Sequence, residues 1–403
     1  MELFWLEHKK LWRKKIVKIC VLLCFVYCVI FGSILSFQWF CFGSSDDYTS
    51  AFGNNFDGYT VIKDSQEYAL SFGGELTDET LQQIVSDYQQ MEADGMEKEL
   101  EKTDWQIVNS WLGTLYPELR DTSNYKTMIS YVDPDKLTGF YERRQQVLDE
   151  FLEISGQVGA EKEFLHQMER KVEKPFHYEW VEGWSTLLGS MVADLGVVMA
   201  LFLGIVLSSL FAGEWHDNTS TLVLTTRNGW GKIALAKILT GLAFTVELFA
   251  LLAVSSVISQ LFFMGTAGWD MPIQNIKLIA VAPMNMLQAE IYEYAFVLLG
   301  AIGFAGIVMF ISAAVKNNVL TLLLSLAVVY GPMMIAEYLP YGMQKALDLI
   351  PLAGSSTDIF RTNTFRIFGK LIWSPYLLIT IPVLIGILCM PFAIKSWSRR
   401  MKA

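Results

Sequence analysis

The sequence predicts an all-α integral membrane protein with six transmembrane helices and a helix-rich α+β extracellular domain inserted between the first and second helices. The chain of 403 residues is 53% hydrophobic and only 18% charged, whereas charged residues make up about a quarter of a typical soluble domain. Several stretches of about 20 residues carry almost no charge, and that length is enough for a helix to cross the hydrocarbon core of a bilayer. These two observations exclude an ordinary soluble protein.

The formal charge is divided unevenly along the chain. Ser44 to Glu182 contains 29 acidic and 12 basic residues, whereas the remainder contains 12 acidic and 19 basic residues. Such a division indicates an acidic, water-exposed insert set into a basic membrane body. We therefore assign residues 43–183 to the extracellular domain.

The first 18 residues combine bulky apolar side chains with six lysines and arginines. This pattern is typical of an amphipathic helix lying in the membrane interface, so we predict such a helix over residues 1–18. Residues 19–42 form the first predicted span, because their apolar run exceeds the roughly 7–15 residues of a signal-peptide core. Cys20, Cys24 and Cys28 recur every four residues, which places them on one helix face as packing residues.

The insert carries three helix signals. Thr77 or Asp78 is expected to begin a helix that continues through TLQQIVSDYQQMEADGMEKELEK, and the DPD turn at 133–135 precedes KLTGFYERRQQVLDEFLEIS. A third helix is predicted in GAEKEFLHQMERKVE. The preceding stretch, GYTVIKDSQEYALSFGGELTDE, mixes β-branched residues with turn formers, which favours a small hairpin.

Residues 184–403 supply five further predicted spans: Leu188–Ala212, Ile233–Phe263, Ile291–Val315, Val319–Ala336 and Ile372–Ile394. Both chain ends are rich in lysine and arginine, so the positive-inside rule predicts cytoplasmic termini and a multi-pass plasma membrane protein. The mixed polarity of residues 337–370 favours short helices at the outer surface. An aromatic belt at the span ends is expected from Trp39, Trp180, Trp184, Trp373 and Tyr376.

The segment 213–232, GEWHDNTSTLVLTTRNGWGK, lies on the cytoplasmic side in this topology. Asp217, Asn218 or Thr219 is suited to cap a short helix through Thr226, and the Asn-Gly pair that follows is suited to end it. Its three aliphatic residues are too few for a core. From the residues alone, a helix that docks into a partner and an amphipathic loop that lies on the membrane both remain open.

Four features carry a resemblance to a known family: PFHYEW..GW at 175–184, GEW…T..LVLTTRNG at 213–229, the pair Lys232 and Lys237, and a six-span order with a large insert after the first span. In these features the chain resembles the permease subunit of type-2 ABC exporters of the Gram-positive bacterial kind with a large extracellular domain. The resemblance implies a cytoplasmic coupling segment at 213–232, docked in a cleft of a separate ATPase. Asn218 departs from the family, whose members often have glycine there. The implied ATPase-coupling residues are Glu214, Thr219, Thr221, Leu222, Leu224, Thr225 and Arg227.

The sequence contains no G-x-x-x-x-G-K-[ST] phosphate-binding loop; Gly231-Lys232 is the nearest approach. We therefore expect no enzyme activity and no cofactor in this chain, with ATP and Mg bound by two copies of a partner ABC ATPase. The other expected partners are a second permease, identical or homologous, and the lipid bilayer, with no nucleic acid. The predicted function is export of a peptide, lipid-like or drug-like substrate. The alternative is a membrane sensor for extracellular antimicrobial peptides that acts with a partner and without transport.

Three ionisable residues fall in the predicted spans, where such groups are rare and often functional. Asp194 and Glu247 are the candidates for the substrate pathway, with a structural role or a charge pairing as the alternative. Lys237 lies near the inner end of its span, and we interpret it as a lysine that extends its ammonium toward water.

Overall fold

The computed structural model describes residues 2–31, 62, 66–67, 69, 73–96, 105–121, 126–217, 219, 231–354 and 356–399. Within this part of the chain, five helices are long and apolar enough to cross a membrane. They are α11 (Val192–His216), α13 (Lys232–Met264), α14 (Met286–Ala314), α15 (Asn318–Ile335) and α17 (Ser374–Arg399). Each coincides with one of the five predicted spans of the membrane body, which confirms that this body is built from long apolar helices.

Two further helices come from the N-terminal region. They are α1 (Glu2–Arg13) and α2 (Lys15–Phe31), separated by a bend at Lys14. The rest of the first predicted span lies outside the described residues. Cys20, Cys24 and Cys28 are buried free thiols on one face of α2, which confirms that they share a face and pack against neighbouring helices.

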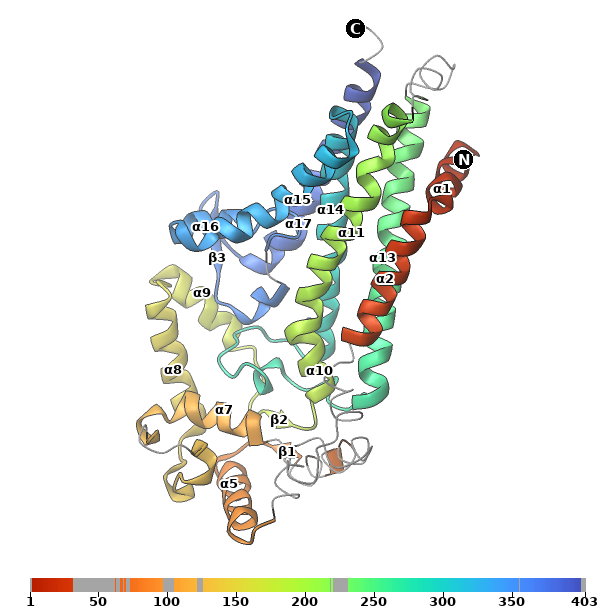
Figure 1. Cartoon of the computed structure of the whole chain (residues 1–403). Helices are drawn as coiled ribbons and strands as arrows, with labels where there is room; N and C mark the ends of the chain where they lie inside the picture. Colours follow the sequence, from red (N-terminus) through yellow and green to blue (C-terminus); the bar gives the residue numbers. More distant parts are fainter. Residues whose placement is uncertain are drawn as a thin grey trace.

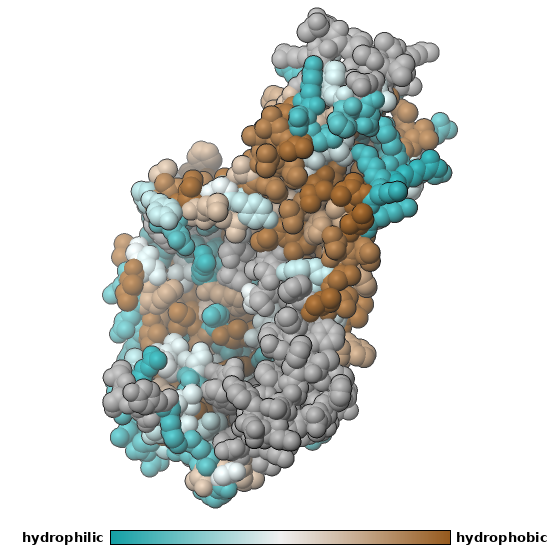
Figure 2. All heavy atoms as spheres, viewed as in Figure 1, coloured by the Kyte–Doolittle hydropathy of each residue, from teal (hydrophilic) through white to brown (hydrophobic). Residues whose placement is uncertain are grey.

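The outward surface of the long helices is apolar. Figure 2 shows hydrophobic residues gathered over these helices, with mostly hydrophilic residues at the upper end and over the insert below. Large exposed side chains on this surface include Leu239, Val254, Ile258, Leu323 and Leu388. A continuous apolar surface of this kind is suited to contact with lipid.

Helix α14 lies at the centre of the bundle, packed against both α11 and α17. Glycines allow its close approach to α17: a Cβ built on Gly386 would lie 2.5 Å from the Cα of Gly303. Gly306 meets the backbone of Gly386 in the same way. Small residues let helix backbones approach closely in membranes, where van der Waals packing drives helix association.

The insert is a separate layer of short helices around its own core. Its helices are α5 (Asp78–Ala93), α7 (Trp105–Leu115), α8 (Phe140–Ile154) and α9 (Ala160–Glu169), with short 3-10 turns η1 (Pro117–Leu119), η2 (Met128–Ser130) and η3 (Pro134–Lys136). The three predicted helices correspond to α5, α8 and α9, whereas α7 was not predicted. The Thr77 side chain caps α5 by accepting a hydrogen bond from the Thr80 amide, as expected.

The two ends of the insert meet in a two-stranded antiparallel sheet, formed by β1 (Gly74–Glu75) and β2 (His177–Tyr178). Half of the stretch in which we expected a hairpin lies outside the described residues. In the described half, residues 62, 66–67 and 69 are helical and Gly74–Glu75 pairs with His177–Tyr178, so the expected hairpin is wrong there. In Figure 1, α5, α7 and α8 lie at the lower end of the molecule, and both chain termini lie at the upper end. The long helices connect these two ends.

The insert is joined to the membrane body through the loop between α13 and α14, which contains η5 (Ile273–Asn275). The buried Arg144 of α8 donates from Nε to the Leu278 carbonyl at 2.7 Å and from a terminal nitrogen to the Ala280 carbonyl at 3.2 Å. The Trp111 indole also donates to the Asn275 carbonyl. These bonds fix the insert to the outer loop of the body.

Short elements cover the remaining connections. They are α10 (Glu182–Thr186) and η4 (Leu187–Met191) before α11, then η6 (Ala336–Tyr338), α16 (Tyr341–Leu347), η7 (Ser356–Phe360), β3 (Thr364–Ile367) and β4 (Lys370–Trp373) before α17. The predicted short helices occur here, but β3 and β4 form a hairpin that the sequence interpretation lacked.

The prediction of an aromatic belt at the span ends is wrong for three of its five residues. Trp180, Trp184 and Trp373 are buried. The indoles of Trp180 and Trp184 donate to the carbonyls of Met264, the last residue of α13, and Thr266, two residues beyond it, so they stabilise the junction instead of contacting lipid. Tyr376 is exposed as expected, and Trp39 lies outside the described residues.

Candidate functional site

A buried ion pair joins the facing ends of α11 and α13. Glu214 lies in the last turn of α11 and Lys237 near the start of α13. Their side chains are only 3% and 2% exposed, and the Lys237 Nζ lies 2.8 Å from the Glu214 Oε1. Since charges are costly to bury unless they are paired, this contact fixes the two helix ends to each other.

Helix α1 completes the site with two further charges. The Lys10 Nζ lies 2.6 Å from the same Glu214 oxygen, and the Glu7 Oε2 lies 2.8 Å from the Lys237 Nζ. Glu7 and Lys10 are three residues apart, so they lie on the same face of α1. We call these four residues, Glu7, Lys10, Glu214 and Lys237, the ionic cluster.

Two neighbours extend the ionic cluster. The Thr219 hydroxyl donates to the Glu214 carboxylate, and the Thr219 amide donates to the Glu214 carbonyl at 3.0 Å. The Lys14 ammonium donates to the Ser209 hydroxyl at 2.9 Å. Burial lowers the pKa of Lys14, and the nearby charges of Lys237 and Lys10 lower it further. This end of the bundle therefore concentrates both signs of charge around the segment that connects α11 to α13.

The Lys10 ammonium is held in its charged form by the cluster. Burial alone would lower the pKa of Lys10, but the hydrogen bond to Glu214 and the charges of Glu214 and Glu7 outweigh burial and raise it. Lys10 is about half exposed, so it lies at the water-facing rim of the site. Glu214 and Lys237 form its buried centre.

Glu247 also contacts α1, farther along α13. Its Oε1 lies 3.1 Å from the His8 Nε2, and its Oε2 accepts a hydrogen bond of 3.1 Å from the Trp12 indole. The Trp12 ring packs edge-on against Phe244, with 5.8 Å between ring centroids. Polar residues of α13 within the apolar span are thus matched by polar residues on one face of α1. Glu247 therefore has two polar partners on α1, the His8 imidazole and the Trp12 indole.

The other predicted site residues are placed as follows. Thr221, Leu222, Leu224, Thr225 and Arg227 lie outside the described residues, as does Asn218. Asp194 belongs to α11, but its side chain is not described. The interpretation of Lys237 as a lysine extended toward water is wrong, because the helices bury its ammonium between two carboxylates.

Two acidic residues on α14 were missed by the sequence interpretation. Glu290 and Glu293 are buried, and their four carboxylate oxygens have no hydrogen-bond partner among the described residues. The sequence could have identified them, because Glu293 is an ionisable residue inside the predicted span Ile291–Val315 and Glu290 lies one helical turn before it. Glu7 carried no such signal, since its pairing with Lys237 depends on how α1 packs.

The ionic cluster is a mechanical and electrostatic joint between helices. Within the described residues no group of three or more His, Cys, Asp or Glu side chains could hold a metal ion. The cluster's acids are matched by its own lysines. No protein family, curated protein or solved structure matches this chain.

Proposed function

We propose that this chain is the transmembrane permease subunit of an ATP-binding cassette transporter. It exports a peptide, lipid-like or drug-like substrate, using ATP hydrolysed by a separate ATPase subunit. The observation that supports the proposal best is the ionic cluster, which joins α1, α11 and α13 and includes Glu214 of the segment 213–232. That segment is the one that resembles the coupling segment of the permease family.

The ionic cluster provides a route for force from the coupling segment into the bundle. The segment is continuous with α11 at one end and with α13 at the other. Separating one partner of a buried ion pair costs about 3–5 kcal/mol, so α11 and α13 resist moving apart at this end. Through the contact of Glu7 with the buried Lys237, α1 moves with them. A push on the segment would therefore tilt three helices as a unit.

The proposal includes the arrangement of partners and sides. ATPase subunits of this kind act in pairs, so two copies of the partner and a second permease, identical or homologous, complete the transporter. ATP and Mg bind to the partner. The termini and the coupling segment face the cytoplasm, and the insert lies outside the plasma membrane, in agreement with the basic chain ends.

Purification of the full chain from its native membranes tests the proposal. We expect a nucleotide-hydrolysing subunit to co-purify and to show Mg-dependent ATPase activity that the permease changes. Lys237→Met should leave the partner bound but largely abolish the effect of the permease on ATPase activity, because the ion pair that holds α11 to α13 is lost. Lys277→Met, an exposed lysine on the outer loop, is the matched control. Absence of any ATP-hydrolysing companion would refute the proposal.

A sensor without transport is the second candidate. The observation that favours it is the rigid attachment of the insert to the α13–α14 loop through Arg144. An antimicrobial peptide bound outside would thus have a direct connection to two long helices. Purified complex in sealed vesicles separates the two functions: ATP-dependent movement of a bound peptide supports export, and binding without flux supports sensing.

A further inference from the structure

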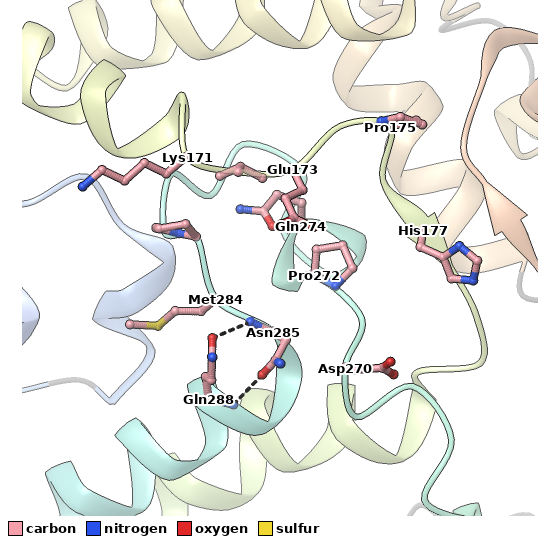
Figure 3. A pocket seen from close by; sticks show the side chains of 12 residues that line it. Lys171, Glu173, Pro175, His177, Asp270, Pro272, Gln274, Met284, Asn285 and Gln288 are labelled. Atoms are coloured by element: carbon pink, nitrogen blue, oxygen red, sulfur yellow. Dashed lines mark hydrogen bonds between the residues drawn. The ribbon is translucent and has the colours of Figure 1, made fainter.

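A pocket of about 360 Å³ lies where the insert joins the membrane body. One wall is the last part of the insert, from Lys171 to His177, and the other is the α13–α14 loop with the start of α14, from Asp270 to Gln288 (Figure 3). Pockets that hold small ligands typically measure about 300–1,000 Å³. This one is therefore large enough for a small ligand or for one side chain of a larger one.

The floor of the pocket contains a buried hydrogen-bond acceptor with no donor. Gln274 is fully buried, and its Nε2 donates to the carbonyls of Ala280 and Ala282 at 2.9 and 3.0 Å. These two bonds fix the orientation of the amide. Its Oε1 has no hydrogen-bond partner among the described residues. Because an unpaired buried polar atom is unfavourable, a ligand that brings an N–H donor gains from this position.

Two exposed carboxylates, Glu173 and Asp270, lie on opposite walls of the same pocket. Neither forms an ion pair with a described residue, although many other acids of the insert do. The basic residue of the pocket, Lys171, extends away from the other labelled side chains in Figure 3. Glu173, Asp270 and the Gln274 Oε1 are therefore three acceptors available to a ligand, and two of them are negatively charged.

The remaining lining offers apolar contact. Three prolines and a methionine line the pocket between the polar groups: Pro175, Pro272, Pro283 and Met284. Asn285 and Gln288 are held by a reciprocal capping box at the start of α14, drawn as dashed lines in Figure 3. The walls are thus held by a strand, three prolines and a capped helix start, which favours a preformed site.

We infer that this pocket binds an organic cation with several N–H donors, namely a primary ammonium or a guanidinium group. Glu173 and Asp270 attract the charge, Gln274 accepts a hydrogen bond from the group, and the prolines with Met284 contact its aliphatic stem. Charge-assisted hydrogen bonds of this kind are about twice as strong as neutral ones. The inference does not depend on the proposed permease function, because no partner ATPase is needed for binding.

The test uses the purified full chain in detergent and three probes. Agmatine represents a free organic cation, acetyl-Gly-Arg-Gly-amide represents a peptide-borne one, and acetyl-Gly-Gln-Gly-amide is the neutral control. We expect one or both cations to bind and the neutral peptide to bind at least about tenfold more weakly. Tighter binding of the arginine peptide assigns the site to a basic side chain of a peptide, and tighter binding of agmatine assigns it to a free amine.

Variants locate the binding in the pocket. Glu173→Gln combined with Asp270→Asn should weaken the Kd of the preferred cation at least about tenfold. Glu142→Gln combined with Glu150→Gln removes the same charge from exposed positions on α8 and should leave the Kd unchanged. If the first pair alters the thermal unfolding of the chain, Asp270→Asn alone replaces it. Unchanged affinity in the pocket variants, equal binding of the neutral peptide, or no binding of either cation overturns the inference.

Discussion

At the residue scale, the ion pairs of this chain differ in burial, and burial decides their effect on stability. Glu214 and Lys237 are almost completely buried, whereas Lys10 on the same carboxylate is half exposed. Breaking a buried pair leaves an uncompensated charge, which costs about 3–5 kcal/mol, but an exposed pair contributes only about 0–1 kcal/mol. The centre of the ionic cluster therefore holds the helices, and its rim contributes little.

A double-mutant cycle tests this difference. Glu214→Gln and Lys237→Met should each lower the free energy of unfolding by about 3 kcal/mol or more, because each leaves one buried charge without its main partner. The double variant should lose less than the sum of the two, since neither of the two most deeply buried charges then remains. Thermal unfolding of the purified chain in detergent is the measurement. Lys10→Met is the control and should change stability by about 1 kcal/mol or less; additive losses in the cycle would contradict direct coupling.

Arg144 and Glu169 form a second buried ion pair in the insert, where acid should weaken it. Burial raises the pKa of Glu169, but hydrogen bonds from Lys174 and Arg144, together with their charges, outweigh it and lower the pKa below its ordinary value of 4.5. The stability contributed by the ionised carboxylate is therefore fully present above pH 4.5. It is lost as the pH falls through the lower pKa of the folded state.

Glu169→Gln should accordingly unfold at a lower temperature than the wild-type chain at pH 7, because Arg144 stays buried without its carboxylate. The difference should narrow as the pH falls below 4.5, since the wild-type glutamate then becomes neutral as well. Thermal unfolding followed at pH 7 and in steps down to the acid limit measures both effects. Glu150→Gln, at an exposed position of α8, should match the wild type throughout. A gap that stays constant with pH would show that the charge of Glu169 does not stabilise the fold.

At the element scale, the closest helix contact joins α14 and α17, and it depends on glycine. Gly386→Ala should separate these helices, because its Cβ would lie 2.5 Å from the Gly303 backbone, and overpacking typically costs about 1–3 kcal/mol. Gly331→Ala is the matched control on α15, where a Cβ meets nothing within 4 Å. It should be neutral or stabilising by up to about 1 kcal/mol. The unfolding temperature of each variant in detergent is the measurement; equal temperatures would mean that the contact tolerates a methyl group.

The long helices were predictable because apolar length alone identifies a span. The predicted span Ile233–Phe263 differs from α13 by one residue at each end. The short elements were less predictable: α7 is only 11 residues long, and the hairpin of β3 and β4 lies in a stretch of mixed polarity. Local sequence determines a long apolar helix, but short elements depend on what they pack against.

The candidate site was predictable only in its position along the chain. Glu214 was selected through the resemblance to the permease family, and Lys237 was noted as an ionisable residue near the inner end of a span. Their partners Glu7 and Lys10 could not be selected, because a basic N-terminal helix is equally typical of a membrane surface. Packing of α1 against α13 brings Glu7 and Lys10 to the ionic cluster, and no local pattern in the sequence encodes that packing.

At the scale of the whole molecule, two polar regions lie at opposite ends of an apolar bundle. The ionic cluster lies at the end that carries both termini, and the insert with its pocket lies at the other end (Figure 1). Helices α13 and α14 are connected by the loop that Arg144 and Trp111 bind. Helix α13 therefore carries Lys237 near one end and is followed at its other end by the loop that the insert binds. A movement of the insert would act on the same helix that holds the ionic cluster.

This arrangement predicts that the two ends face opposite sides of the membrane. In a background with the native cysteines replaced, Glu150→Cys on the insert should react with a membrane-impermeant maleimide in intact cells. Asp217→Cys, beside the ionic cluster, should react only after the cells are permeabilised, because the proposed topology, based on the basic chain ends, places that side in the cytoplasm. Both positions are exposed, so accessibility to water is not the limiting factor, and a membrane-permeant maleimide should label both without permeabilisation. Labelling of Asp217→Cys from outside would place the coupling segment where no cytoplasmic ATPase could reach it.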